Sequence, residues 1–165
     1  FYRIGSAVVP DAYLQVLTII YTRIKDTPIN WAVTGSLNMA LQGMPVAIHD
    51  IDLQTDKNGA YSIAKIMAEY VDTPVRYLAS DRMRSHLGEL NVNGIQVEIM
   101  GDVQKLLENQ MWEAPVRVKD YQTWVNIAGM EIPVLSLDYE YQAYLKMGRT
   151  EKANLLLAWL HRSLT

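Results

Sequence analysis

Acidic residues in two segments of the chain have the spacing of a divalent-cation site. Asp50 and Asp52 lie in the segment 47–55, where apolar and polar residues alternate as they do in a strand. Because side chains two positions apart in a strand point to the same face, about 6 to 7 Å apart, these carboxylates can share metal ions. Glu98 occupies the polar face of a second alternating segment, 95–99. If the two strands are neighbours, three carboxylates converge, and such a cluster is costly unless cations such as Mg²⁺ or Mn²⁺ neutralise it.

A glycine turn precedes the carboxylates in the chain. Gly35 and Ser36 follow a predicted buried strand, 29–33, and lead into a short predicted helix, 37–42. Backbone N–H groups and the helix dipole at such a turn favour an anion, and glycine lets the backbone approach a phosphate closely. Each feature alone has a simpler interpretation, since such turns are common and a lone Asp-x-Asp pair is usually a solvated strand face. The segment 47–55 carries no other charged residue, however, which favours a binding site.

The order of these motifs resembles a known pattern. In chain order it consists of Thr34-Gly35-Ser36, thirteen residues, Asp50-Ile51-Asp52, and Glu98 on a later strand. This order is similar to the minimal pattern of nucleotidyltransferases of the DNA polymerase β superfamily. Within that superfamily the chain most resembles small stand-alone bacterial and archaeal proteins. It resembles more distantly the lincosamide and aminoglycoside nucleotidyltransferases and the AbiEii-type proteins.

The resemblance implies a role for each matched residue. Gly35, through its backbone, and Ser36 would hold the β- and γ-phosphates of a nucleoside triphosphate. Asp50 and Asp52 would bind two Mg²⁺ ions. Glu98 would bind the catalytic ion and help to deprotonate the attacking hydroxyl group, although the superfamily usually has the shorter aspartate at this position.

Basic residues suggest where the phosphates would be neutralised. Lys146 and Arg149 lie in the tail segment 144–149. This segment resembles the basic helix that these families use near the triphosphate, and a solvated helix face is the alternative interpretation. Arg84 belongs to the basic segment 76–86 and is a candidate contact for phosphates or for the acceptor, with a solvated loop as the alternative.

Hydrophobic periodicity predicts one sheet flanked by helices. Strands are expected at 29–33, 47–55, 75–79, 87–92, 95–100 and, as a pair that turns at Gly129, 124–134. Helices are expected at 11–26, 37–42, 58–72, 102–107, 138–147 and from Thr150 onward, with Asp102 as the cap of the fourth. Asn93-Gly94 is a strong hairpin signal, so the strands on either side of it are expected to be antiparallel neighbours.

These elements predict a single α+β domain that spans residues 1–165. It has a mixed β-sheet with flanking helices, and the resemblance implies the nucleotidyltransferase fold. The core is expected at 28–135, and residues 136–165 are expected to form a C-terminal helical hairpin.

The composition excludes several other kinds of site. The 165 residues contain no cysteine, which removes thiol nucleophiles and disulfides and favours a reducing, cytoplasmic setting. The 15 Lys and Arg residues against 18 Asp and Glu residues give a net charge of −3, which argues against bulk electrostatic binding of nucleic acid. The longest uncharged stretch, 27–49, is interrupted by proline, glycine and asparagine, so no membrane span is predicted. No signal peptide is apparent at the start, and residues that precede Phe1 are left open.

The resemblance implies an enzyme, a Mg²⁺-dependent nucleotidyltransferase. It would move a nucleoside monophosphate, with AMP from ATP as the favoured case, to a hydroxyl group of an unknown acceptor and release pyrophosphate. One alternative is a nucleotide-binding module with little or no catalysis that acts with a small helical partner protein, as in toxin–antitoxin pairs. Another is a metal-dependent phosphodiesterase. A homo-oligomer is a further expectation left open, because the acceptor pocket would have to come from the tail, a second copy or a partner.

Overall fold

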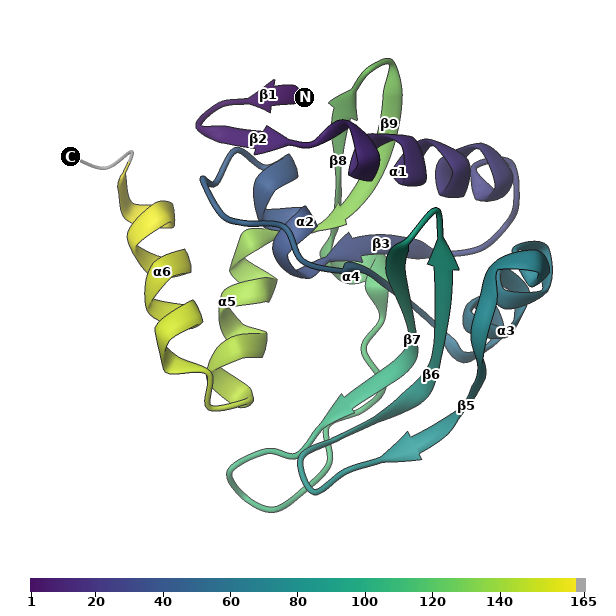
Figure 1. The fold of residues 1–165 in the computed structure, drawn as a ribbon. Helices are drawn as coiled ribbons and strands as arrows, with labels where there is room; N and C mark the ends of the chain where they lie inside the picture. The colour runs from purple at the N-terminus through teal and green to yellow at the C-terminus, as the bar shows by residue number, and fades with distance from the viewer. Residues whose placement is uncertain (163–165) are drawn as a thin grey trace.

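The computed structural model describes residues 1–162 and contains a seven-stranded mixed sheet (Figure 1). Its strands in chain order are β3 (Trp31–Thr34), β4 (Ile51–Thr55), β5 (Val71–Ala79), β6 (Met83–Val92), β7 (Ile95–Lys105), β8 (Gln122–Ile127) and β9 (Met130–Leu135). Their order across the sheet is β5-β6-β7-β4-β3-β9-β8. A small separate sheet pairs β1 (Tyr2–Ile4) with β2 (Ala7–Val9), and neither strand was predicted.

The helices cover the two faces of the sheet unequally. In chain order they are α1 (Asp11–Ile24), α2 (Gly35–Leu41), α3 (Lys57–Ile66), the 3₁₀ turn η1 (Ala68–Tyr70), α4 (Val118–Tyr121), α5 (Leu137–Lys146) and α6 (Thr150–His161). Helices α1 and α3 pack against each other and against β7, whereas α5 and α6 form a hairpin that packs at one side of the molecule (Figure 1).

The two central strands carry the core on one face and polar groups on the other. Four apolar side chains of β4 and β7 are fully buried and belong to the same core cluster as residues of α1 and α3; they are Ile51, Leu53, Val97 and Ile99. Because successive side chains of a strand point to opposite faces, Asp52 and Glu98 point away from this core. The face with the carboxylates is the one that α5 approaches.

Several predictions from the sequence are confirmed. The protein has the expected α+β fold with a mixed sheet and flanking helices. Asn93 and Gly94, with φ angles of 52° and 85°, join β6 to β7 as an antiparallel hairpin. The tail folds as a helical hairpin that turns at Gly148, which has a φ of 72°. Residues 163–165 of the predicted tail lie outside the described residues.

The predicted helix at 102–107 is wrong, because these residues continue β7 as far as Lys105. Asp102 has a φ of +51° and lies where the register between β6 and β7 shifts, so β7 contains one extra residue. This β-bulge interrupts the two-residue period and produces an apolar spacing that imitates a helix.

The predicted strand at 47–55 is too long at its start. Strand β4 begins at Ile51, and residues 44–49 have no regular structure. Its neighbour β3 ends at Thr34, which pairs with Asp52, so no backbone partner from β3 exists for the residues before Ile51. Asp50 therefore lies in a bend before the strand rather than within it.

No helix within residues 1–162 has the length and apolarity that crossing a membrane requires.

Candidate active site

Two carboxylates stand side by side on the face of the sheet opposite the core. Asp52 on β4 is the direct partner of Glu98 on the parallel strand β7, so the condition under which the two carboxylates come together is met. Both residues line a cavity of about 240 Å³ that is also lined by α5 and by the turn between α5 and α6. Asp50 is exposed at the bend before β4, yet its charge contributes to raising the pKa of both carboxyl groups.

The carboxylates are poorly stabilised as anions. Burial raises the pKa of Asp52 to about 7, and the charges of Glu98 and Asp50 act in the same direction. Burial and nearby carboxylates also raise the pKa of Glu98. A hard divalent cation would relieve this repulsion, so the donor set fits Mg²⁺ or Mn²⁺. Within residues 1–162 no three Asp, Glu, His or Cys side chains are already arranged around one metal position.

The glycine turn packs directly onto Asp52. Gly35 has a φ of +72°, in the left-handed region that favours glycine, and it lines the cavity. A Cβ atom at this position would lie 2.4 Å from Oδ2 of Asp52. The turn therefore needs glycine both for its backbone conformation and for the close approach of the carboxylate.

Ser36 lies beside the cavity rather than in it. Its Oγ accepts a hydrogen bond of 3.0 Å from the backbone N–H of His49. It lines an adjoining groove together with Lys152 of α6. The predicted Gly-Ser motif is thus divided, because Gly35 faces the carboxylates and Ser36 faces the groove.

Glu140 is a buried carboxylate that the sequence patterns did not indicate. It lies on α5 with 3% exposure, and burial raises its pKa. One of its oxygens, Oε1, accepts hydrogen bonds from the Thr34 hydroxyl, from the Gly35 N–H at 3.3 Å and from Asn38 Nδ2 at 2.9 Å; the three donors act against that rise. Glu140 thereby connects the C-terminal hairpin to the glycine turn, and it occupies the Gly35 N–H that the sequence had suggested for a phosphate.

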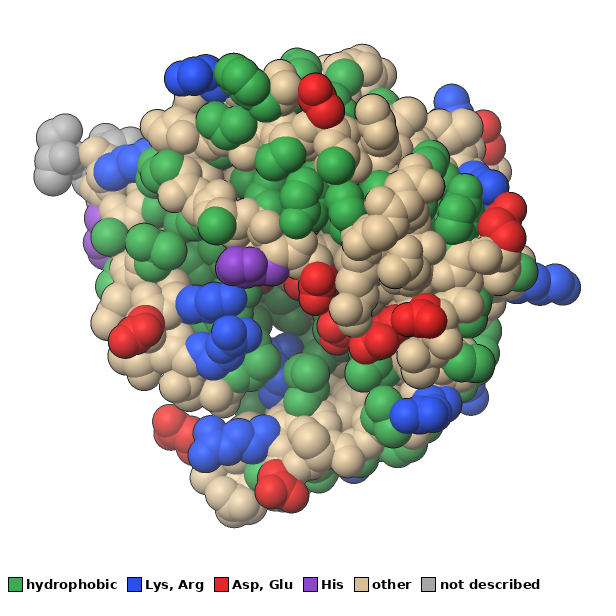
Figure 2. Space-filling view, viewed as in Figure 1, with side chains coloured by type: hydrophobic (Ala, Val, Ile, Leu, Met, Phe, Trp, Pro, Cys, Tyr) green, Lys and Arg blue, Asp and Glu red, His purple; other side chains and the backbone are tan. Residues whose placement is uncertain are grey.

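One basic side chain of the hairpin lines the cavity, and a second lies in the groove beside it. Arg149, which precedes α6, lines the cavity, and its guanidinium lies 5.3 Å from the ring centre of Tyr144. Lys152 lies within α6, and its charge opposes the rise in the pKa of Asp52. Figure 2 shows acidic side chains along one rim of a surface hollow and Lys or Arg side chains along the opposite rim.

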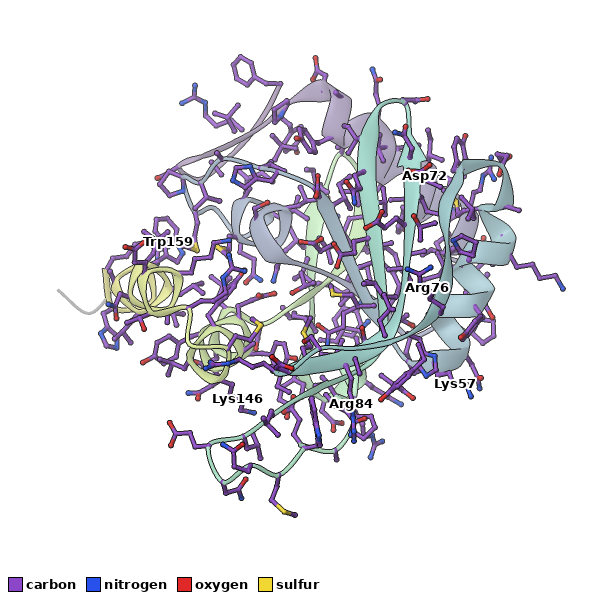
Figure 3. The ribbon with its side chains drawn as sticks, turned by 60° about the horizontal axis from the view of Figure 1, so that its bottom comes forward. Lys57, Asp72, Arg76, Arg84, Lys146 and Trp159 are labelled. Carbon is purple, nitrogen blue, oxygen red and sulfur yellow. The ribbon has the colours of Figure 1, made fainter. Side chains whose placement is uncertain are left out.

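Two other predicted basic residues lie outside the cavity. Lys146 places its Nζ 3.2 Å from Oε1 of Glu113. Arg84 stacks its guanidinium 4.3 Å from the ring centre of Trp112 and donates from Nε to Gln104 at 3.0 Å. Figure 3 shows Lys146 at the end of α5 and Arg84 on the ribbon formed by β6 and β7. Both side chains are already engaged with protein groups.

The far end of the cavity contains a lysine that the sequence patterns also did not indicate. Lys105 is buried at the end of β7 and lies beside Tyr139 of α5. The cavity thus combines carboxylates and ammonium or guanidinium groups with apolar walls. Such an arrangement can hold a phosphorylated ligand at the charged rims and a second molecule inside.

Comparison with known families identifies the class to which this site belongs. The sequence profile of the aminoglycoside-2''-adenylyltransferases matches residues 16–157, which is most of the chain. The chain belongs to this adenylyltransferase family. It is a nucleotidyltransferase, so the resemblance of its motifs to the nucleotidyltransferase superfamily is confirmed.

Solved structures of other proteins support the assignment. The adenylyltransferase is similar to TM1012, a proposed nucleotidyltransferase of Thermotoga maritima, with 54% identity over 94% of this chain and 96% of that one and a TM-score of 0.84. Two antibiotic-modifying enzymes share the fold. LnuA with bound lincomycin has 16% identity over 80% and 84% of the two chains and a TM-score of 0.52. ANT(2")-Ia in complex with adenylyl-2"-tobramycin has 14% identity over 90% of each chain and a TM-score of 0.56. No curated protein matches the sequence.

Proposed function

We propose that this nucleotidyltransferase transfers AMP from ATP to a hydroxyl group of a small acceptor and releases pyrophosphate, with Mg²⁺ or Mn²⁺ as cofactor. The observation that carries the proposal is the pairing of Asp52 with Glu98 at a cavity whose opposite rim is basic. Membership of an adenylyltransferase family supports adenylyl as the transferred group.

The acidic residues are suited to hold the cation and to direct the reaction. Asp50, Asp52 and Glu98 would supply its oxygen ligands, and the bound cation would stabilise charge on the attacking and leaving oxygens. A bond forms between the acceptor oxygen and the α-phosphorus, and the bond from that phosphorus to the oxygen bridging to the β-phosphate breaks. Glu98 takes up the proton of the attacking hydroxyl, and pyrophosphate carries away the electron pair of the broken bond.

The basic rim is suited to hold the leaving phosphates. Arg149 lines the cavity with the carboxylates, and Lys152 lines the adjoining groove and interacts electrostatically with Asp52; both would neutralise the β- and γ-phosphates. The Ser36 hydroxyl beside Lys152 can still donate its proton to a phosphate, because in its bond to His49 it acts only as an acceptor. The role of Gly35 is conformational, since its N–H is bonded to Glu140.

Glu140 would act as a positioning residue. It does not need to touch the reacting atoms, because its bonds to Thr34, Gly35 and Asn38 fix the turn against which Asp52 packs. The C-terminal hairpin therefore contributes two positively charged side chains and a carboxylate that fixes the position of the glycine turn.

The proposal is tested by titration and by product analysis. Mg-ATP is titrated calorimetrically into wild-type protein and into the Asp50→Ala, Asp52→Ala double variant, with exposed Asp138→Asn on α5 as the charge control. We expect the double variant alone to lose most of the affinity. Labelled ATP with hydroxyl acceptors should yield pyrophosphate and an adenylylated acceptor in equal amounts. Equal affinity of the double variant, or AMP as the only labelled product, would contradict the proposal.

A further inference from the structure

The cavity beside the carboxylates extends to a buried lysine. Lys105 is 2% exposed and lines the cavity. It reaches the cavity because of the bulge at Asp102, since β7 directs Glu98 and Met100 inward before the bulge, and Val103 and Lys105 after it. Without the extra residue, Lys105 would point to the opposite face of the sheet.

The carboxylate that forms an ion pair with Lys105 is shared with a second lysine. Nζ of Lys105 lies 2.9 Å from Oε2 of Glu113. The other oxygen of the same carboxylate lies 3.2 Å from Nζ of Lys146. One carboxylate therefore contacts two ammonium groups, and Glu140 of α5, which lines the same cavity, is a further carboxylate whose pKa Lys105 lowers.

A tyrosine adds a second hydrogen-bond donor to this end. The hydroxyl oxygen of Tyr139 accepts hydrogen bonds from Lys105 at 3.2 Å and from Nε2 of Gln54 at 3.3 Å. Because the oxygen accepts twice, its own proton is available, and no acceptor for it lies among the residues that the structure describes. An ammonium group and a phenol facing a desolvated cavity select a hydrogen-bond acceptor, above all an anionic oxygen.

The size of the cavity and its apolar walls restrict the ligand further. A volume of about 240 Å³ is below the usual range for pockets that hold drug-sized ligands, about 300 to 1,000 Å³. Apolar side chains also line the cavity, among them Met83, Ala143 and Met147. A fitting molecule is small and has an apolar middle.

We infer that the acceptor is a small hydroxy acid, whose carboxylate binds Lys105 and Tyr139 while its hydroxyl faces Asp52 and Glu98. The inference rests on the proposed transfer to a hydroxyl group. The hydroxyl oxygen forms the bond to the α-phosphorus and loses its proton to Glu98, pyrophosphate leaves, and the carboxylate of the acceptor is unchanged. The family is named after aminoglycosides, which are polycations, and an ammonium group at this end would meet Lys105 as a like charge.

Matched probes test the inference without nucleotide. Each pair shares a hydroxyl group and a spacer and differs in its other end; examples are 4-(hydroxymethyl)benzoate with 4-(hydroxymethyl)benzylamine, and 6-hydroxyhexanoate with 6-aminohexanol. Affinities are measured by ligand-observed NMR at constant ionic strength, with tobramycin as a further probe. We expect at least one carboxylate to bind about tenfold or more tightly than its amine partner. Binding of no carboxylate, or equal or tighter binding of every amine and of tobramycin, would overturn the inference.

Two variants that change the charge beside the cavity in opposite directions distinguish ligand recognition by Lys105 from a purely structural role. Lys105→Met should abolish the preference for carboxylates. Glu113→Gln removes the neutralising partner of Lys105, so it should tighten the carboxylate probes severalfold and weaken the amines. Lys57→Met, on the distant helix α3 (Figure 3), is the charge control, and thermal unfolding verifies that each variant is folded. The inference is contradicted if the preference for carboxylates over amines persists in Lys105→Met, or if it changes in the same direction in both variants. If Lys105→Met does not fold, the result for Glu113→Gln decides alone.

The outcome is separable from that of the proposed function. The probe titrations contain no ATP, so a missing carboxylate preference refutes the acceptor class even if AMP is transferred to another hydroxyl compound. Conversely, a carboxylate preference without adenylylated product upon addition of Mg-ATP counts against the proposed transfer and leaves the binding site in place.

Discussion

Replacing Gly35 with alanine should damage catalysis far more than stability. At a φ of +72° any residue other than glycine costs about 1 to 2 kcal/mol. The new methyl group would also lie 2.4 Å from Oδ2 of Asp52. The carboxylate must therefore retreat by about 1 Å to reach an ordinary contact distance, and a displacement of this size at a reacting centre can lower the rate about 100-fold.

Gly129 provides a matched control for the conformational part of the effect. It has a φ of +79° in the turn between β8 and β9, and an added Cβ would meet no described atom within 4 Å. Gly129→Ala should therefore lower the melting temperature by roughly 2 to 8 °C without changing the rate of transfer. Gly35→Ala should lose at least as much stability and about 100-fold in kcat.

Thermal unfolding and release of labelled pyrophosphate measure the two effects separately. Binding of Mn²⁺, followed by electron paramagnetic resonance, reports the position of Asp52 without turnover. If Gly35→Ala and Gly129→Ala lose equal stability and both retain the wild-type rate and Mn²⁺ affinity, the close contact between the turn and Asp52 has no catalytic importance.

The site leads to three further predictions. Asp52→Asn should stabilise the metal-free protein by up to about 4 kcal/mol at pH 8. The pKa of Asp52 is raised from 3.8 to about 7 in the folded state, so the folded state keeps the proton to higher pH than the unfolded state, and the stability of the wild type falls between about pH 4 and 7. Urea unfolding in the presence of EDTA should show this pH dependence for the wild type but not for Asp52→Asn. Glu140→Ala leaves three hydrogen-bond donors without their acceptor, so it should lower the free energy of unfolding by about 2 to 4 kcal/mol and should affect kcat more than KM. Glu140→Gln should restore much of the stability and much of kcat. Equal effects on KM and kcat would indicate a purely structural role. Arg149→Met and Lys152→Met should each weaken Mg-ATP binding by calorimetry about tenfold, and Lys65→Met on α3 should not; unchanged affinity in both would exclude the hairpin as the phosphate site.

The face of the sheet that Asp52 and Glu98 occupy was predictable because local periodicity determines it, whereas the parallel pairing of β4 with β7 is a long-range contact that periodicity alone does not determine. Alternation in the segments around Asp52 and Glu98 predicts which face each side chain occupies. Asn93-Gly94 has the backbone conformation of a tight hairpin, so it fixes the pairing of β6 with β7 without any long-range information. The helical tail follows in the same way from its apolar spacing and from Gly148.

Glu140 and Lys105 were not predictable, because their positions depend on distant partners or on an irregular backbone. The partners of Glu140 lie 102 to 106 positions away, and an acidic residue in the first turn of a helix is ordinary. Lys105 faces the cavity only because the bulge shifts β7 by one residue. The compositional signal of the bulge is weak, because it consists only of Gly101 within the strand pattern, and the positive φ falls on the next residue, Asp102, rather than on the glycine.

Strands β4 and β7 explain how the protein tolerates two neighbouring carboxylates whose charges repel each other. Each carboxylate of the site alternates with fully buried apolar residues of β4 and β7, which are Ile51, Leu53, Val97 and Ile99. Burial of each such side chain contributes about 1.5 to 3 kcal/mol as an upper estimate, so the four together outweigh the roughly 4 kcal/mol that the raised pKa of Asp52 represents. The core face thus holds the carboxylates close together in the absence of a cation. Two of the proposed cation ligands, Asp52 and Glu98, are therefore in place before a cation binds, and the third, Asp50, would join them from the bend before β4.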